Sequence, residues 1–380
     1  MLTPLVAEAD EFRLLPSISQ DLMYNDNVYL TPTLQTHDFI SYTVGGLQLL
    51  DSTELLNLDT SVKVAQSLYK DNTRLDSTDV LTNGTARYSL TPELALSGRV
   101  NYTRDSQPDR DLLTTGLVLS GVRREHETYG ATADYNLTDQ TLASLSYDHW
   151  ADHYGKSFTT TTAFSNLSYD TATLAFQHDL TKFLPSTKGL LDLTYAQYSL
   201  TGIDVYNYEA TAGFKYALQE KWSIQALAGP SYTQSSFNIF VPTLVVSSWG
   251  GVGQASLNYT GEVTSAAFSA SRDIAPASGL NGAVERTSFS LSAERRLSYE
   301  FKGLLSASYF INKSGSGQYS ATPINYQTFN FAPGIRYEFN RDMYLEASYT
   351  FTRIEDRQAD LTANRNLFLV RFFIQHAVME

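Results

Sequence analysis

Hydrophobic and polar residues alternate with a period of two along most of the chain, from about Phe12 onward. In residues 56–68 the even positions are mostly apolar, as at Leu58 and Val62, and the odd positions are polar, as at Asn57. This period is typical of β-strands with one wet and one apolar face, because successive side chains of a strand point to opposite sides. The pattern therefore predicts a β protein.

The alternating segments are long, and residues 206–218 and 329–339 show the same pattern. Soluble strands usually have about 5–6 residues, whereas a tilted strand needs roughly 9–11 to cross a bilayer. No apolar run approaches the roughly 20 residues of a spanning helix. We therefore expect strands, not helices, to cross a membrane.

Connections alternate between short and long, as the two ends of an outer-membrane barrel require. The short connections include residues 91–93, 138–140, 219–221 and 340–342, and the long ones include 25–36, 104–124, 149–160, 234–247, 272–283 and 313–323. Pairing each short turn with its two strands gives nine hairpins, hence about 18 strands. The expected fold is an all-β, antiparallel, up-and-down transmembrane β-barrel over residues 10–380.

Aromatic residues mark two levels along the expected strands. One set precedes or follows the short turns and the other lies about a bilayer's apolar thickness further along, so we expect two membrane girdles. The predicted girdle residues are Tyr88, Tyr102, Tyr135, Tyr147, Tyr216, Trp222, Tyr232, Tyr337 and Tyr349.

The outward face argues against the alternative of a soluble β-sandwich. A soluble sandwich carries its charges on the outside, whereas the apolar face here has almost no formal charge between the two girdles. Only Arg295, near a turn, clearly breaks this rule. No repeat of 20–50 residues supports a propeller or a solenoid.

Composition removes several classes of protein. The chain has no cysteine, which excludes disulfides and thiolate metal sites, and its formal charge of −13 disfavours a nucleic-acid partner. Residues 1–9 end in a small-x-small pattern without a charged or fully apolar region before it, and we interpret them as the remnant of a signal peptide. The location in the bacterial outer membrane is predicted from the expected transmembrane β-barrel.

Inward positions carry charges of both signs. The predicted lumen residues are Lys63, Arg87, Arg99, Asp134, Asp192, Glu209, Lys215, Arg286, Glu294, Arg296, Arg336, Glu346 and Arg371. Barrels of about 16–18 strands normally enclose water, which such a wall would solvate. We favour structural charge ladders over a substrate track. Loop acids such as Asp26 and Asp109 would bias the mouth towards cations.

Motifs of catalysis are absent, and we expect neither an enzyme nor a cofactor. His149 and His153 with Asp148 and Asp152 are the only local cluster that resembles a metal site, and we interpret them as solvated residues near a strand end. A Ser-His-Asp site assembled from distant residues has no specific support.

Residues 16–30, with the segment Asn25-Asp26-Asn27, followed by residues 37–40, resemble the opening hairpin of the β-barrel porin 2 family. Residues 116–137 and the closing segment 365–369 are also similar to that family's pattern. The resemblance implies an outer-membrane barrel, often encoded with machinery for exopolysaccharide export. The chain departs from the pattern after Ile374, where residues 375–380 follow instead of a terminal aromatic residue.

Three functions follow as hypotheses. The first is a passive conduit for secreted exopolysaccharide, with outer-membrane lipid and lipopolysaccharide around it and periplasmic export proteins as partners. The second is a general diffusion porin, which would need a charged constriction loop folded into the barrel, for which residues 104–124 are the best candidate. The third is a barrel that sheathes a multihaem cytochrome.

Overall fold

A computed structural model describes residues 11–106, 111–112, 115–116, 122–157, 166–238, 242–277, 282–320 and 322–378, and these ranges contain eighteen strands and one short 3₁₀ helix, Thr73–Leu75. The strands are β1 (Glu11–Asn25), β2 (Asp38–Ser52), β3 (Leu56–Tyr69), β4 (Ser77–Ser89), β5 (Leu94–Asp105), β6 (Val122–Thr138), β7 (Thr141–Ser157), β8 (Leu167–Asp179), β9 (Thr187–Leu200), β10 (Ile203–Gln219), β11 (Trp222–Phe237), β12 (Leu244–Thr260), β13 (Thr264–Pro276), β14 (Ala283–Arg296), β15 (Phe301–Ser314), β16 (Ile324–Glu338), β17 (Met343–Asp356) and β18 (Leu361–Gln375). No helix in the described ranges is long and apolar enough to cross a membrane.

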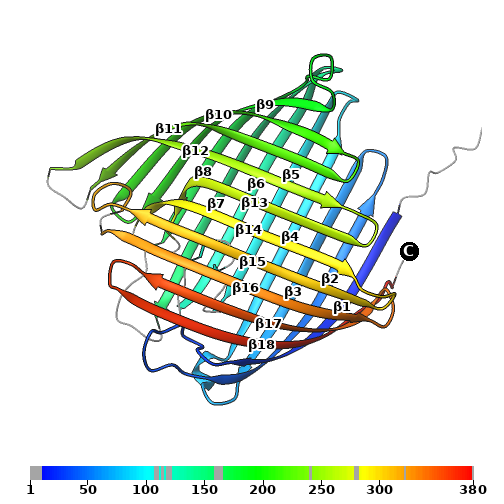
Figure 1. The fold of residues 1–380 in the computed structure, drawn as a ribbon, viewed down its shortest axis with the longest axis vertical. Coiled ribbons are helices and arrows are strands. Elements are labelled where there is room, and N and C mark those ends of the chain that lie inside the picture. Colours follow the sequence, from blue (N-terminus) through cyan, green and yellow to red (C-terminus); the bar gives the residue numbers. More distant parts are fainter. Residues whose placement is uncertain are drawn as a thin grey trace, which may run out of the picture.

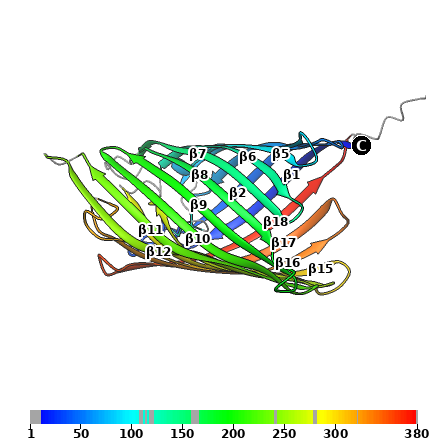
Figure 2. The same cartoon turned by 90° about the horizontal axis from the view of Figure 1, so that it is seen from above.

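The strands form one closed sheet. Each strand pairs antiparallel with the strands before and after it, and β18 pairs back onto β1. Figures 1 and 2 show the result, a flattened barrel whose strands are strongly tilted and whose β1 and β18 lie side by side. The predicted up-and-down barrel of about 18 strands is confirmed. Because β1 and β18 pair with each other, neither strand leaves an unpaired edge at the seam.

The outer face of this sheet is apolar and exposed. Leu22, Val62, Val64, Phe214 and Phe368 each keep 44–59% of their surface accessible. A water-soluble protein rarely leaves so many large apolar side chains uncovered. A closed antiparallel barrel with an apolar outer belt is the architecture of bacterial outer-membrane proteins, and the chain is located there.

The aromatic residues predicted as girdles lie on this outer face. Tyr88 pairs across the sheet with Leu56 and Leu96, close to the periplasmic turns. Near the other end, Tyr349 packs against Phe368 with ring centroids 4.9 Å apart. Their contact with lipid headgroups stays a prediction.

Several connections differ from the expected lengths. The predicted loop 149–160 is strand up to Ser157, and the predicted loop 272–283 is strand up to Pro276. The alternation of short and long connections is also imperfect, because β9 and β10 join through Thr201 and Gly202 alone at the outer end. The strands continue to pair beyond the apolar belt. Turn-forming and charged residues are frequent there, and for this reason the sequence predicted loops in these stretches.

Charges on the outer face are more numerous than expected. Besides Arg295, the structure places Arg272 and Glu285 there, with their Nη2 and Oε1 atoms 2.8 Å apart. Arg272 lies in the stretch 272–283 that was predicted to be a loop, and Glu285 lies just after it on β14. The expectation of a single outward charge was therefore wrong.

The seam between the first and last strands is held by polar side chains. Arg371 donates from Nε and Nη2 to the carboxylate of Asp21, at 2.8 and 2.6 Å. Above this pair, Asn27 is fully buried and its side-chain amide donates to the carbonyls of Thr31 and Asn364, each at 2.9 Å. The segment Asn25-Asp26-Asn27 thus fastens the outer end of the closed barrel. The predicted signal remnant, residues 1–9, lies outside the described residues.

Candidate functional site in the barrel lumen

The connection between β5 and β6 crosses the inside of the barrel. Asn312 on β15 donates from Nδ2 to the carbonyl of Thr115 at 2.7 Å, and Thr328 on β16 donates to the carbonyl of Gly116. Going round the barrel, β15 is separated from β5 by nine strands in one direction and seven in the other. The loop therefore reaches the opposite wall.

Glycine is required where this loop meets the wall. Gly116 has a φ of +71°, and a Cβ there would lie 2.6 Å from Cβ of Phe310. Only glycine adopts this left-handed conformation without strain and also tolerates such a close approach. Nearby, Leu112 is almost fully buried, and Asn330 donates to its carbonyl at 3.5 Å.

The base of the crossing loop is tied down by one arginine. Arg124 on β6 places Nη1 2.8 Å from a carboxylate oxygen of Asp111 in the loop, and Nη2 3.4 Å from one of Asp105 at the end of β5. Asp152 on β7 lies 3.7 Å from the same guanidinium, and its carboxylate is also 2.8 Å from Nδ1 of His126. All three acids are buried, so Arg124 is the cation that makes their burial possible.

The contacts of the crossing loop identify the inner face of the wall. Asn330 pairs across the sheet with Ser308 and Thr352, and Thr352 pairs with Arg365 on β18. Because cross-strand partners share a face and alternate residues change face, the inner face can be followed around the barrel. The predicted lumen residues all have this parity, as the pairings of Arg371 with Glu346 and with Asp21 illustrate.

Many of these residues form ion pairs along the inner wall. The pairs are Arg87–Asp134 (2.8 Å), Arg99–Asp148 (2.5 Å), Arg286–Asp273 (2.6 Å), Arg336–Glu346 (2.7 Å), Arg371–Asp21 (2.6 Å) and Lys302 with Glu294 (3.3 Å) and Glu338 (2.7 Å). Glu209 instead accepts a hydrogen bond from Asn207. Within the described part of the chain, no ion pair forms at Lys63, Asp192, Lys215 or Arg296.

The arginines of this wall are more exposed than their acidic partners. The side chains of Arg87 and Arg99 are 51% and 58% exposed, whereas those of Asp134 and Asp148 are 20% and 22% exposed. A long guanidinium side chain covers the short carboxylate beneath it. The charge presented to the lumen on β4–β7 is therefore basic, although the formal charges balance.

A hollow of about 510 Å³ lies against this basic surface. It is lined by inner-face residues of β1–β6, among them Asn57, Asp59, Arg87, Arg99 and Thr132. The hollow lies towards the short turns, below the level at which the β5–β6 loop crosses. Polar solutes would meet this surface on one side of the crossing loop.

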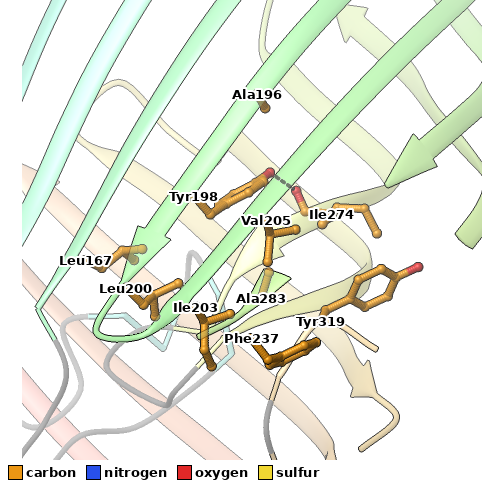
Figure 3. Close-up of a cluster of buried hydrophobic side chains, with 10 residues drawn as sticks. All are labelled: Leu167, Ala196, Tyr198, Leu200, Ile203, Val205, Phe237, Ile274, Ala283 and Tyr319. Carbon is orange, nitrogen blue, oxygen red and sulfur yellow. Dashed lines mark hydrogen bonds between the residues drawn. The ribbon is translucent and has the colours of Figure 1, made fainter. Parts of the chain in front are cut away.

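The opposite part of the lumen is filled near its outer end by apolar side chains. This apolar plug, shown in Figure 3, consists of Leu167, Ala196, Tyr198, Leu200, Ile203, Val205, Phe237, Ile274, Ala283 and Tyr319. The hydroxyl of Tyr198 donates to the carbonyl of Ile274 at 2.6 Å, which fastens β13 to the inner wall at β9. The apolar side chains exclude water from this part of the lumen. The hollow lined by polar residues lies on the side of β1–β6.

Sequence reasoning missed the residues that join distant parts of the chain. It did not single out Asp273 and Lys302, although both fall at inward positions of the alternation and could have been found there. Asn312 and Thr328 gave no signal, because a wall residue that binds a loop resembles any other polar inward residue. The cluster His149, His153, Asp148 and Asp152 does not converge, since the histidines and the aspartates lie on opposite faces of β7.

No family model matches the chain, and no curated protein matches its sequence. Among solved structures, OccK3 (OpdO) of Pseudomonas aeruginosa is 10% identical with a TM-score of 0.48, and the match covers 97% of this chain and 96% of that one. OccAB2 of Acinetobacter baumannii is 12% identical with a TM-score of 0.48, covering 97% and 98%. The copper transporter OprC is 11% identical with a TM-score of 0.47, and the match covers 93% of this chain but 62% of that one, so the chain spans less than two thirds of that protein. We derive neither family nor function from likenesses at this level.

Proposed function

We propose that this protein is a passive outer-membrane channel for small polar solutes. The observation that carries the proposal is the β5–β6 loop, whose residues Thr115 and Gly116 bind the wall opposite to the strands from which the loop arises. A loop fixed across the bore narrows it to a size that hydrated small molecules pass. A loop in this position is what the porin hypothesis requires, and it supports the proposal.

The two other hypotheses both need an unobstructed bore. A polysaccharide chain in transit and a cytochrome in a sheath would each occupy the centre of the barrel, where the crossing loop and the apolar plug now lie. Periplasmic export proteins and lipopolysaccharide stay predicted partners. No observation of the described residues favours either of these alternatives over diffusion.

The path of a solute would follow the basic inner wall of β4–β7. Arg87 and Arg99 present half-exposed guanidinium groups there, and such groups attract carboxylate and phosphate groups in a water-filled channel whose walls have a low dielectric constant. We therefore infer a preference for anionic solutes. The expectation that acidic loops bias the mouth towards cations stays a prediction.

Conductance in planar bilayers tests the proposal. The wild-type barrel should give steady, ohmic openings, and a variant in which residues 106–121 are replaced by a short Gly-Ser turn should give larger ones. A folded wild-type barrel that conducts nothing would overturn the proposal, and so would a truncated loop that leaves the conductance unchanged. Heat-dependent migration on gels verifies that both barrels are folded.

A further inference from the structure

The wall of the barrel is open between β12 and β13 over its outer part. Their pairing runs from Thr260 and Ser265 only to Gly253 and Arg272. β12 continues to pair with β11 as far as Leu244, and β13 with β14 as far as Pro276. Among the described residues, the stretch 244–252 of β12 thus has a partner strand on one side only.

The separation arises because the end of the β13–β14 hairpin bends into the barrel. Ile274 and Ala283, at the end of this hairpin, are buried in the apolar plug against Tyr198 and Val205 (Figure 3). The hydrogen bond from Tyr198 to the carbonyl of Ile274 uses a group that would otherwise face β12 or solvent. Packing of the plug therefore holds β13 away from β12.

The opening faces the outer half of the membrane. On the outer face Trp249 pairs with Tyr232, with ring centroids 5.1 Å apart, and Trp249 is 76% exposed. Pairing with β13 has already ended four residues nearer the membrane centre, at Gly253. An unpaired strand edge is costly where only hydrocarbon covers it, so this edge of β12 needs a polar group beside it.

A groove on the lipid-facing wall leads to this opening. It has a volume of about 790 Å³, and its outer-face lining combines the small residues Ala212, Ala226, Ala228, Gly251, Gly253 and Ala255 with the rings of Phe214 and Phe289. Arg272 lies at its margin with a half-exposed guanidinium beside Glu285. Small side chains leave room for an alkyl chain, and the cation is placed for a polar headgroup.

We propose that this opening is a lateral passage that takes the alkyl chain of an outer-leaflet amphiphile from the membrane to the apolar plug. The groove receives the chain, Arg272 contacts its headgroup, and the buried apolar residues of the plug lie at the inner end of the opening. The passage is separate from the polar path along β4–β7. It gives the barrel a second class of ligand.

Tryptophan fluorescence in brominated lipid tests the passage. Trp150 lies on the inner face and packs against the plug, so lipid outside an intact wall cannot touch it. In a variant that retains only Trp150 (W222F, W249F), vesicles of phosphatidylcholine brominated on its acyl chains should quench the emission. A matched variant that retains only Trp249 reports direct contact with the membrane.

Engineered disulfides can close the opening selectively, because the chain has no cysteine of its own. Extending the register of β12 and β13 pairs Gly251 with Ile274, so oxidised G251C/I274C should close the opening and at least halve the quenching of Trp150, with recovery on reduction. The pair A255C/A270C joins residues that already face each other and should change nothing.

A groove-filling variant gives a second readout that does not need a disulfide. Ala255→Phe should weaken the quenching of Trp150, whereas Ala133→Phe, on the outer face of β6, should not. The proposal is overturned if Trp150 is never quenched, or if quenching survives both the disulfide and Ala255→Phe. It is also overturned if single-cysteine G251C barrels cross-link efficiently to one another, because the edge of β12 would then be covered by a second copy.

Discussion

Asp26 and Asn366 are 340 positions apart in the chain and form hydrogen bonds with each other across the seam of the barrel. The backbone N–H and the side-chain amide of Asn366 donate to the two carboxylate oxygens of Asp26 at 2.7 and 2.6 Å, and the N–H of Asp26 donates back to the carbonyl of Asn366 at 3.2 Å. The segment Asn25-Asp26-Asn27, which carried the family resemblance, is thus a fastening for β18.

We expect Asn27→Ala to destabilise the barrel by about 2 kcal/mol, because the carbonyl groups of Thr31 and Asn364 lose their donor, the side-chain amide of the fully buried Asn27. Urea unfolding in lipid vesicles, followed by tryptophan emission, measures the change. Asn136→Ala is the matched control, since Asn136 is exposed beside a periplasmic turn. If both substitutions lower the free energy of unfolding equally, the hydrogen bonds of Asn27 do not stabilise the barrel more than those of an exposed asparagine.

A charged residue should be tolerated on the inner face and not on the outer one. Val62→Arg places a cation against lipid near the middle of β3 and should cost about 2–4 kcal/mol. Its neighbour Ser61 has the inward parity, so Ser61→Arg should cost much less. The folded fraction at equilibrium in urea gives both values, and a similar loss at the two positions would contradict the assignment of faces.

Arg124→Gln should release the crossing loop. Its loss leaves the buried carboxylates of Asp105, Asp111 and Asp152 without their common cation, a change that costs about 3–5 kcal/mol in buried pairs. We expect higher single-channel conductance and faster proteolysis within residues 106–121. Arg123→Gln keeps Arg124 and its contacts, so its conductance and its rate of proteolysis should equal those of the wild type. If Arg124→Gln also leaves both properties unchanged, Arg124 does not anchor the loop.

The double substitution Arg87→Gln and Arg99→Gln should lower the ratio of anion to cation permeability. Reversal potentials across a bilayer with a salt gradient measure this ratio. The effect should shrink as salt rises, because charges are screened within about 10 Å at 0.1 M and about 3 Å at 1 M. Lys182→Gln, in the turn after β8, removes one exposed cation outside the lumen and should leave the ratio unchanged.

Alternation was sufficient to predict the strands because one physical contrast, lipid against water, acts on every residue of the wall. Val62 and Lys63 differ in polarity for that reason alone, and the same contrast predicted the inward parity of Arg87 and Asp134. Arg272 was missed because residues 272–283 were assigned to a loop, whereas β13 continues to Pro276, and its partner Glu285 on β14 was not singled out.

Contacts between distant segments could not be predicted in this way. Nothing in the local sequence of Gly116 points to Thr328, and nothing near Gly253 shows that pairing with β13 ends there. Both depend on how loops pack inside a barrel that is already closed. The crossing loop was predicted only as a long, charged connection, and its contacts with β15 and β16 came from the structure.

The loop that crosses the barrel also sets an order of events during assembly. Thr115 and Thr328 belong to parts of the chain that are translated far apart, and the hydrogen bond from Thr328 to Gly116 spans 212 positions. Contacts of such long range form late, because the entropy of closing the loop between them opposes each one until neighbouring strands are in place. A half-built sheet ending before β15 offers the loop no anchor, so the loop is fixed across the lumen only when the last hairpins dock.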